Sequence, residues 1–179
     1  FYGLQVEELS YATSLIPTNV AIATRNQELC NNATPEINSQ QGVLYAELKS
    51  LESNFTYNYF VSLSDGTQNN RLEIRQSGTG LQFLWRVGGV YQNSISLANA
   101  PFESFIKFAL CYSSTDIKFY VNGSLVGTIL TPTLYSSGVL NNVEFADGGL
   151  GNPCRGIIKG LKIFNTALTD AQLQTLTTI

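Results

Sequence analysis

The sequence predicts an all-β protein, built as a sandwich or barrel of short antiparallel strands. Segments in which apolar and polar residues alternate recur along most of the chain, and turn-forming glycine, asparagine or aspartate separates them. Hydrophobic residues make up 44% of the 179 residues and charged residues 13%, which supplies enough apolar material for one large core. A single helical pattern stands at the end of the chain.

The first two strands follow a period of two, which places alternate side chains on opposite faces. They are expected at residues 42–51 and 57–64. In the second, we expect Tyr59, Val61 and Leu63 to share one face, because each is two positions from the next.

The remaining strands are set by turns and by apolar runs. Asn122-Gly123 is the preferred pair for a tight type I′ turn, since both positions need positive φ, and it predicts a hairpin. Residues 105–112 are nearly all apolar, as expected for a central strand. The other expected strands are residues 71–76, 81–87, 91–97, 117–121, 125–130, 142–145 and 156–164.

A capping box predicts the C-terminal helix. Thr169 and Gln172 have the required spacing, and Ala171, Leu173 and Leu176 form an apolar side. We expect a short helix packed across one edge of the sheets. Residues 1–19 are expected to form an N-terminal strand and linker segment, and residues 20–179 the domain itself.

Composition excludes several function classes. The chain has no histidine, which removes Ser-His-Asp and Cys-His nucleophiles and every histidine-containing metal site. A net charge of −3 argues against a general nucleic-acid binder. The longest uncharged run, residues 119–143, contains turn residues and predicts strands rather than a membrane span. We therefore expect neither nucleic-acid binding nor membrane insertion.

The three cysteines, Cys30, Cys111 and Cys154, leave two alternatives open. They have no metal-ligand spacing, so one reading is three thiols without a chemical role. The other is a Cys30–Cys154 disulfide that joins the two ends of the domain.

Five segments match one family pattern in order: residues 42–47, 62–66, 70–74, 120–123 and 161–173. Together they resemble the laminin-G-like, concanavalin A-like lectin/glucanase domains, in the form found in bacteriophage structural proteins and Bacteroidetes surface proteins. The resemblance implies a two-sheet antiparallel jelly-roll sandwich with one short C-terminal helix. Because this fold hosts many activities, it is less specific for function.

The resemblance implies a non-enzymatic carbohydrate-recognition module, extracellular, on a phage virion fibre or a bacterial cell surface. The alternative is a structural or decoration module of a capsid or fibre that contacts other subunits. The expected partners are cell-surface glycans or virion subunits, and any homo-oligomer would form through the parent fibre.

A glycoside hydrolase is the third and least favoured reading. Enzymatic relatives carry a motif resembling Glu-x-Asp-x-x-Glu, which is absent here. Glu73 stands between Arg71 and Arg75, and we expect the two arginines to lower its pKa, whereas a general acid needs a raised one. Glu144 likewise has no second glutamate at strand spacing.

A sugar site needs an aromatic ring for stacking and polar groups for the hydroxyls. Trp85 alternates with Phe83 and Val87, so a core position stays open for it. The candidate ligand-binding residues are Tyr57, Tyr59, Asn69, Asn70, Arg71, Trp85, Arg86 and Tyr91.

No cofactor is required by these readings, but the resemblance implies a calcium ion held by loop oxygens. The candidate ligands are Asp147, Glu144 and Asp65. The aspartates also suit plain turn roles, because aspartate followed by glycine is itself a turn former.

Overall fold

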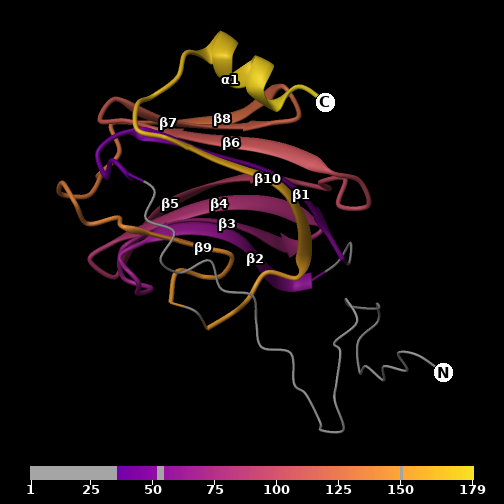
Figure 1. Ribbon diagram of the computed structural model, residues 1–179, viewed down its shortest axis with the longest axis horizontal. Helices are drawn as coiled ribbons and strands as arrows, with labels where there is room; N and C mark the ends of the chain where they lie inside the picture. Colours follow the sequence, from indigo (N-terminus) through magenta and orange to yellow (C-terminus); the bar gives the residue numbers. More distant parts are fainter. Residues whose placement is uncertain (1–35, 52–54, 150) are drawn as a thin grey trace, which may run out of the picture.

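The computed structural model describes residues 36–51, 55–149 and 151–179 (Figure 1). The described chain contains ten strands followed by one helix. Their bounds are β1 Gly42–Ser50, β2 Phe55–Ser64, β3 Arg71–Gly78, β4 Gly80–Val87, β5 Val90–Leu97, β6 Ile106–Tyr112, β7 Asp116–Val121, β8 Ser124–Leu130, β9 Asn142–Glu144, β10 Gly156–Phe164 and α1 Asp170–Thr177.

The strands form two antiparallel sheets of five strands each. Sheet A has the order β10-β1-β6-β7-β8, and sheet B has the order β5-β4-β3-β2-β9. The two sheets stack face to face as separate layers (Figure 1). This arrangement confirms the jelly-roll sandwich predicted from the sequence, and each end of each strand lies within two residues of its predicted position.

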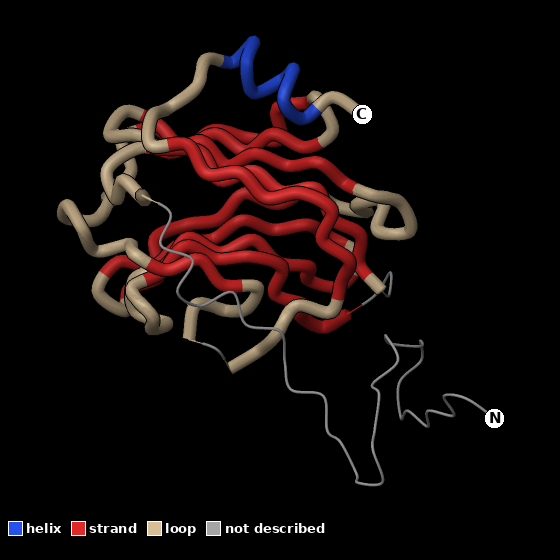
Figure 2. Tube along the Cα trace, in the orientation of Figure 1, coloured by secondary structure: helices blue, strands red, loops and turns tan. Residues whose placement is uncertain are grey.

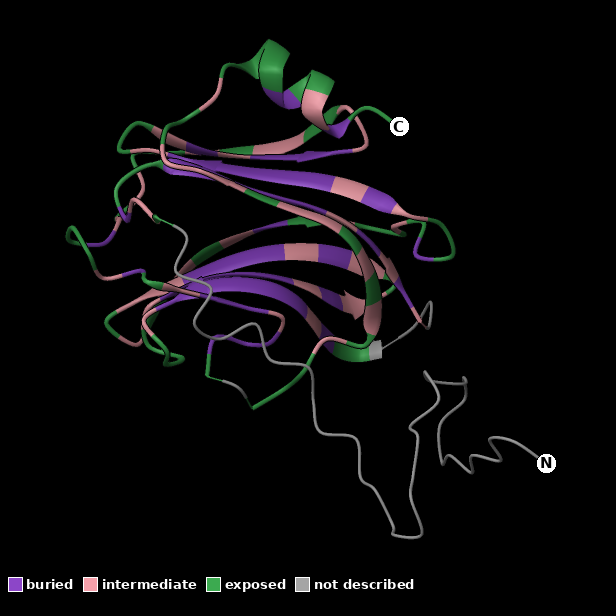
Figure 3. Cartoon of the chain, viewed as in Figure 1, coloured by how far each residue is buried: buried purple, intermediate pink, exposed green. Residues whose placement is uncertain are grey.

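The inner faces of the two sheets form the core. Leu44, Phe108 and Phe119 from sheet A pack in one cluster with Phe60 and Phe83 from sheet B. The ring centroids of Phe83 and Phe119 lie 6.3 Å apart, in a tilted arrangement that joins the layers. Figure 3 shows buried residues along the strands of both sheets.

Irregular pairing in β2 changes which side chains share a face. The register to β3 shifts between Tyr59 and Val61, and Phe60 and Val61 both belong to the core cluster. Tyr59 is the cross-strand partner of Arg75 on the outer face. The prediction that Tyr59, Val61 and Leu63 share one face was therefore wrong, because a β-bulge interrupts the period of two.

The helix covers the outer face of sheet A (Figure 2). Leu173 packs with Tyr45, Ala109 and Tyr120 in a second apolar cluster, so α1 lies on a sheet face rather than on the predicted edge. The capping box of Thr169 is confirmed. Figure 2 shows no helix on the outer side of sheet B within the described residues.

Local predictions elsewhere can be compared directly. Asn122 and Gly123 both have positive φ, 48° and 78°, which confirms the hairpin turn. Cys111 and Cys154 are free cysteines among the described residues, and the Cys30–Cys154 alternative concerns Cys30, which lies outside them. So does the N-terminal segment 1–19. The described residues contain no helix long and apolar enough to cross a membrane.

Candidate functional site

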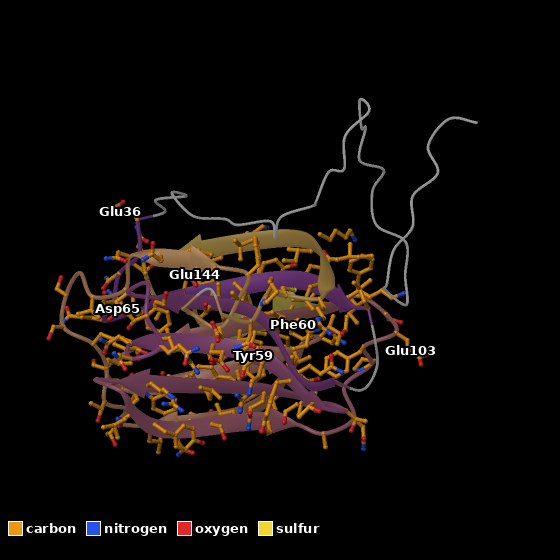
Figure 4. All side chains as sticks on the ribbon, turned by 90° about the horizontal axis from the view of Figure 1, so that it is seen from below. Glu36, Tyr59, Phe60, Asp65, Glu103 and Glu144 are labelled. Atoms are coloured by element: carbon orange, nitrogen blue, oxygen red, sulfur yellow. The ribbon has the colours of Figure 1, made fainter. Side chains whose placement is uncertain are left out.

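The outer face of sheet B carries three rows of cross-strand partners. Each row crosses β2, β3, β4 and β5, and successive rows are two residues apart along β3 and β4. The first row is Tyr59, Arg75, Gln82 and Ser96; the second is Ser62, Glu73, Leu84 and Ser94; the third is Ser64, Arg71, Arg86 and Tyr91. Figure 4 is seen from this side of the molecule, with Tyr59 on β2 and Glu144 on β9 labelled.

The first row carries an aromatic surface. The Arg75 guanidinium lies 4.5 Å from the centroid of the Tyr57 ring and 5.8 Å from that of Tyr59. Arg75 Nε and Nη2 donate hydrogen bonds of 3.0 and 2.8 Å to Gln82 Oε1, which fixes the guanidinium. Tyr57 is 51% exposed. We call Tyr57, Tyr59 and Arg75 the tyrosine platform.

Asn58 fixes the backbone between the two tyrosines. Its side chain is buried, and its Nδ2 donates to Ser50 Oγ at 3.2 Å and to the Arg155 carbonyl at 2.9 Å. Its Oδ1 accepts from the Arg155 N–H at 2.8 Å. Since Asn58 is anchored inside the sandwich, its neighbours Tyr57 and Tyr59 are held in place on the outer side.

Glu73, in the second row, is a buried carboxyl group. Its carboxylate is 0% exposed, with Arg71 Nε at 2.7 Å and Arg75 Nη1 at 3.4 Å. Burial raises the pKa of Glu73 to about 7, against the opposing effect of both arginines. The expectation of a lowered pKa was wrong because burial, which the strand pattern does not reveal, outweighs the two ion pairs.

The carboxylates on this face do not form an accessible catalytic pair. Glu73 and Glu144 both pair in register with Ser62, from opposite sides, so their Cα atoms stand roughly 10 Å apart. Both side chains are buried. A glycosidase needs an acid and a nucleophile or base that touch the substrate, and these two carboxylates do not present one.

The Asp147 carboxylate is engaged by neighbouring residues. Its carboxylate accepts hydrogen bonds from Gln68 Nε2 and Asn152 Nδ2, both at 2.6 Å, and from the backbone N–H groups of Gly149 and Gly151. Burial opposes ionisation, but these hydrogen bonds prevail and lower the pKa of Asp147. Four donors occupy the oxygens that a cation would need.

The other two candidate ligands are also engaged. Asp65 accepts from Thr67 and Asn70 within its own turn, and Glu144 Oε1 accepts from Ser64 Oγ at 3.3 Å. No group of three or more acidic or cysteine side chains converges in the described part of the chain. Calcium binding therefore stays a prediction, and in this structure each of the three candidate carboxylates is engaged by hydrogen-bond donors.

Three candidates have structural positions instead. Trp85 is 2% exposed, stacks on Phe83 at 5.5 Å and donates from Nε1 to the Thr133 carbonyl, so it offers no ring to a ligand. Trp85 is buried because it alternates along its strand in step with the core residues. Asn70 joins two turns, because its Nδ2 donates to Asp65 and its Oδ1 accepts from the Gly88 N–H. Asn69 accepts from the Gly89 N–H through its backbone carbonyl.

The outer face of sheet B brings together the other five candidates, Tyr57, Tyr59, Arg71, Arg86 and Tyr91. Arg75 and Gln82 complete the face and are absent from the sequence-derived set. The alternation of side chains along each strand could have identified both residues. Arg75 shares a face of β3 with Arg71, and Gln82 precedes the core residue Phe83 on β4 and therefore points to the other face of the sheet.

Comparison with known proteins decides the family. Residues 33–174 match the model of the concanavalin A-like lectin/glucanases superfamily. The chain belongs to this superfamily. No curated protein matches it.

Solved structures share the fold of this superfamily member at low identity. The CBM40 domain of the Ruminococcus gnavus IT-sialidase is 18% identical, with 79% of this chain and 84% of that one covered and a TM-score of 0.65. The same domain is known bound to α2,3 sialyllactose. Domain 4 of AbnA, a GH43 extracellular arabinanase from Geobacillus stearothermophilus, in complex with arabinotriose, is 16% identical, with 79% and 68% covered and a TM-score of 0.61.

Proposed function

We propose that this domain is a non-enzymatic carbohydrate-recognition module whose ligand lies on the outer face of sheet B. The tyrosine platform carries the proposal. Tyr57 is half exposed and fixed by Arg75, which suits an aromatic ring that stacks on a sugar. Rigid aromatic anchors bind well because little side-chain freedom is lost.

Polar groups beside the platform suit sugar hydroxyls. Gln82 Nε2 donates to Ser96 Oγ at 3.2 Å, and both residues continue the first row away from the tyrosines. From the first row to the third, Arg75 to Arg71 spans four residues of β3, or roughly 13 Å. A face of that length accommodates a short oligosaccharide.

Two further observations support this assignment. Structures that share the fold include domains bound to sialyllactose and to arabinotriose. The buried carboxylates Glu73 and Glu144 favour binding without a covalent step. Extracellular display, on a virion fibre or bacterial surface, is the setting we propose for such a module.

A glycan-array screen followed by calorimetric titration tests the proposal. We expect one or more glycans to bind with or without a chelator, because four hydrogen-bond donors already engage the Asp147 carboxylate. Tyr57→Ala should weaken binding by about tenfold or more, since stacking and buried ring area are lost.

The matched control is Ile157→Ala, an equally exposed apolar residue on sheet A. It should leave affinity unchanged. Equal losses in both variants, or no effect of Tyr57→Ala on a glycan that does bind, would contradict the platform assignment.

A structural module that contacts other protein subunits is the second candidate. Leu125 and Leu130 are exposed on β8, which is an edge strand of sheet A. Exposed apolar residues on an unpaired edge favour protein contact. Absence of any glycan hit, together with concentration-dependent self-association lost in Leu130→Lys, would favour this candidate.

A further inference from the structure

The third row of sheet B holds an unusual pair of arginines. Arg71 and Arg86 are direct cross-strand partners on the outer face. Like charges directly opposite each other on a sheet are destabilising unless an anion offsets them. The charge balance around them therefore decides what this end of the face can bind.

The acidic groups nearby do not pair equally with both arginines. Glu73 forms close ion pairs with Arg71 and Arg75, and Asp147 also acts on Arg71, whereas Arg86 acts on Glu73 more weakly than the other two arginines do. Arg86 makes no ion pair or side-chain hydrogen bond with any residue that the structure describes, and its Nε is buried without a partner. Arg71 is 5% exposed, and its Nη1 is also buried without a hydrogen-bond partner. Two neighbouring guanidinium groups therefore each have an N–H group without a hydrogen-bond partner.

The pair of arginines is accessible to solvent on the side of β5. Arg86 is half-buried, and its partner on β5, Tyr91, is 50% exposed. On the other side of the pair, Arg71 lies against the segment after β9, where a Cβ added to Gly148 would stand 3.0 Å from Arg71 Cδ. A ligand would therefore reach Arg86 first, with the Tyr91 ring beside it and the charge of Arg71 contributing from β3.

We propose that Arg86, assisted by Arg71, is a subsite for the anionic group of a glycan, a carboxylate or a sulfate; this inference rests on the proposed carbohydrate-binding function. The planar guanidinium matches both groups by paired hydrogen bonds. Tyr91 would contact the ring that carries the charge, and the tyrosine platform would contact a sugar at the other end of the face.

The test uses the whole chain and an array that holds neutral, sialylated, uronic-acid and sulfated glycans. We expect anionic glycans to bind more tightly than neutral glycans of the same core by about tenfold. For the best hit, Arg86→Gln should remove that preference. Arg86→Lys should keep part of it, because lysine supplies the positive charge without the paired N–H donors of the guanidinium. The sialylated and uronic arms distinguish a carboxylate ligand from a sulfate ligand.

Lys162→Gln is the matched control, because it removes one positive charge from the outer side of sheet A, where Lys162 lies over the Tyr45 ring. It should leave the preference intact. Thermal unfolding of each variant excludes a folding defect.

The outcomes separate the two proposals. Binding of neutral glycans alone, or a preference for anionic glycans that survives Arg86→Gln, would overturn the anionic subsite and leave the carbohydrate-binding function standing. Absence of any glycan binding would overturn both.

Discussion

At the scale of single residues, Glu73 shows how burial and charge compete. Its carboxylate lies between arginines, yet complete exclusion from water raises its pKa. Arg71 and Arg75 are thereby fixed: Arg71 lies against Glu73 at 2.7 Å, and Arg75 orients the Tyr57 ring. Glu73 thus acts on the candidate site through its arginines rather than through a ligand.

The Glu73 carboxyl makes stability depend on pH with a predictable sign. Its pKa is about 7 in the folded chain against 4.5 in the unfolded chain, so between these values the folded state holds the extra proton. Stability from this group is full below pH 4.5 and is lost as the pH rises toward 7, by about 3 kcal/mol in all. Urea unfolding at several pH values measures the slope, and Glu73→Gln should remove it.

The quantity to compare between the two proteins is the change of the free energy of unfolding with pH. The free energy itself is not compared, because Glu73→Gln also alters two ion pairs. The lowered pKa of Asp147 acts separately: its contribution is present above the unfolded pKa of 3.8 and is lost at lower pH. An unchanged slope between pH 5 and 7 in Glu73→Gln would show that Glu73 is not its source.

At the scale of elements, sequence prediction succeeded where the signal is local. The Asn122-Gly123 turn and the Thr169 capping box depend on a few adjacent residues, and both were predicted correctly. The β2 bulge was not, because aromatic residues on both sides of the irregular register, Tyr59 and Phe60, give no sign of which one faces the core. The same applies to Asn58, whose anchoring partners come from β1 and residue 155.

The capping box gives the element-scale prediction. Gln172 N–H donates to Thr169 Oγ1, and Thr169 N–H donates to Gln172 Oε1. Thr169→Ala should lower the free energy of unfolding by about 1 kcal/mol, because helix N–H groups lose their acceptor. Denaturant unfolding measures the change. Thr175→Ala, at an exposed position inside the same helix, should leave the free energy of unfolding unchanged or raise it by up to about 0.5 kcal/mol, because alanine has a higher helix propensity than threonine. An equal loss in both variants would contradict a capping role.

At the scale of the whole molecule, the two outer faces differ in what they can do. The outer face of sheet A is covered in part by α1, and all five lysines of the chain lie on the strands of sheet A. The outer face of sheet B carries tyrosines and arginines in register. The sequence predicted most of these side chains as candidates. Their common face, the burial of Glu73 and the engaged carboxylate of Asp147 depend on strand order and loop packing, which one sequence does not reveal.

The location of the ligand is the most direct test of the account. Backbone amide shifts can be followed by NMR in this 19.6 kDa chain while the best glycan from the array is added. We predict that the changes concentrate on Tyr57, Tyr59, Arg75, Arg86 and Tyr91, with no comparable changes at Tyr45, Lys107 and Lys162 on sheet A. Saturable changes centred on sheet A, or on the loops at one end of the sandwich, would contradict a glycan site on the outer face of sheet B.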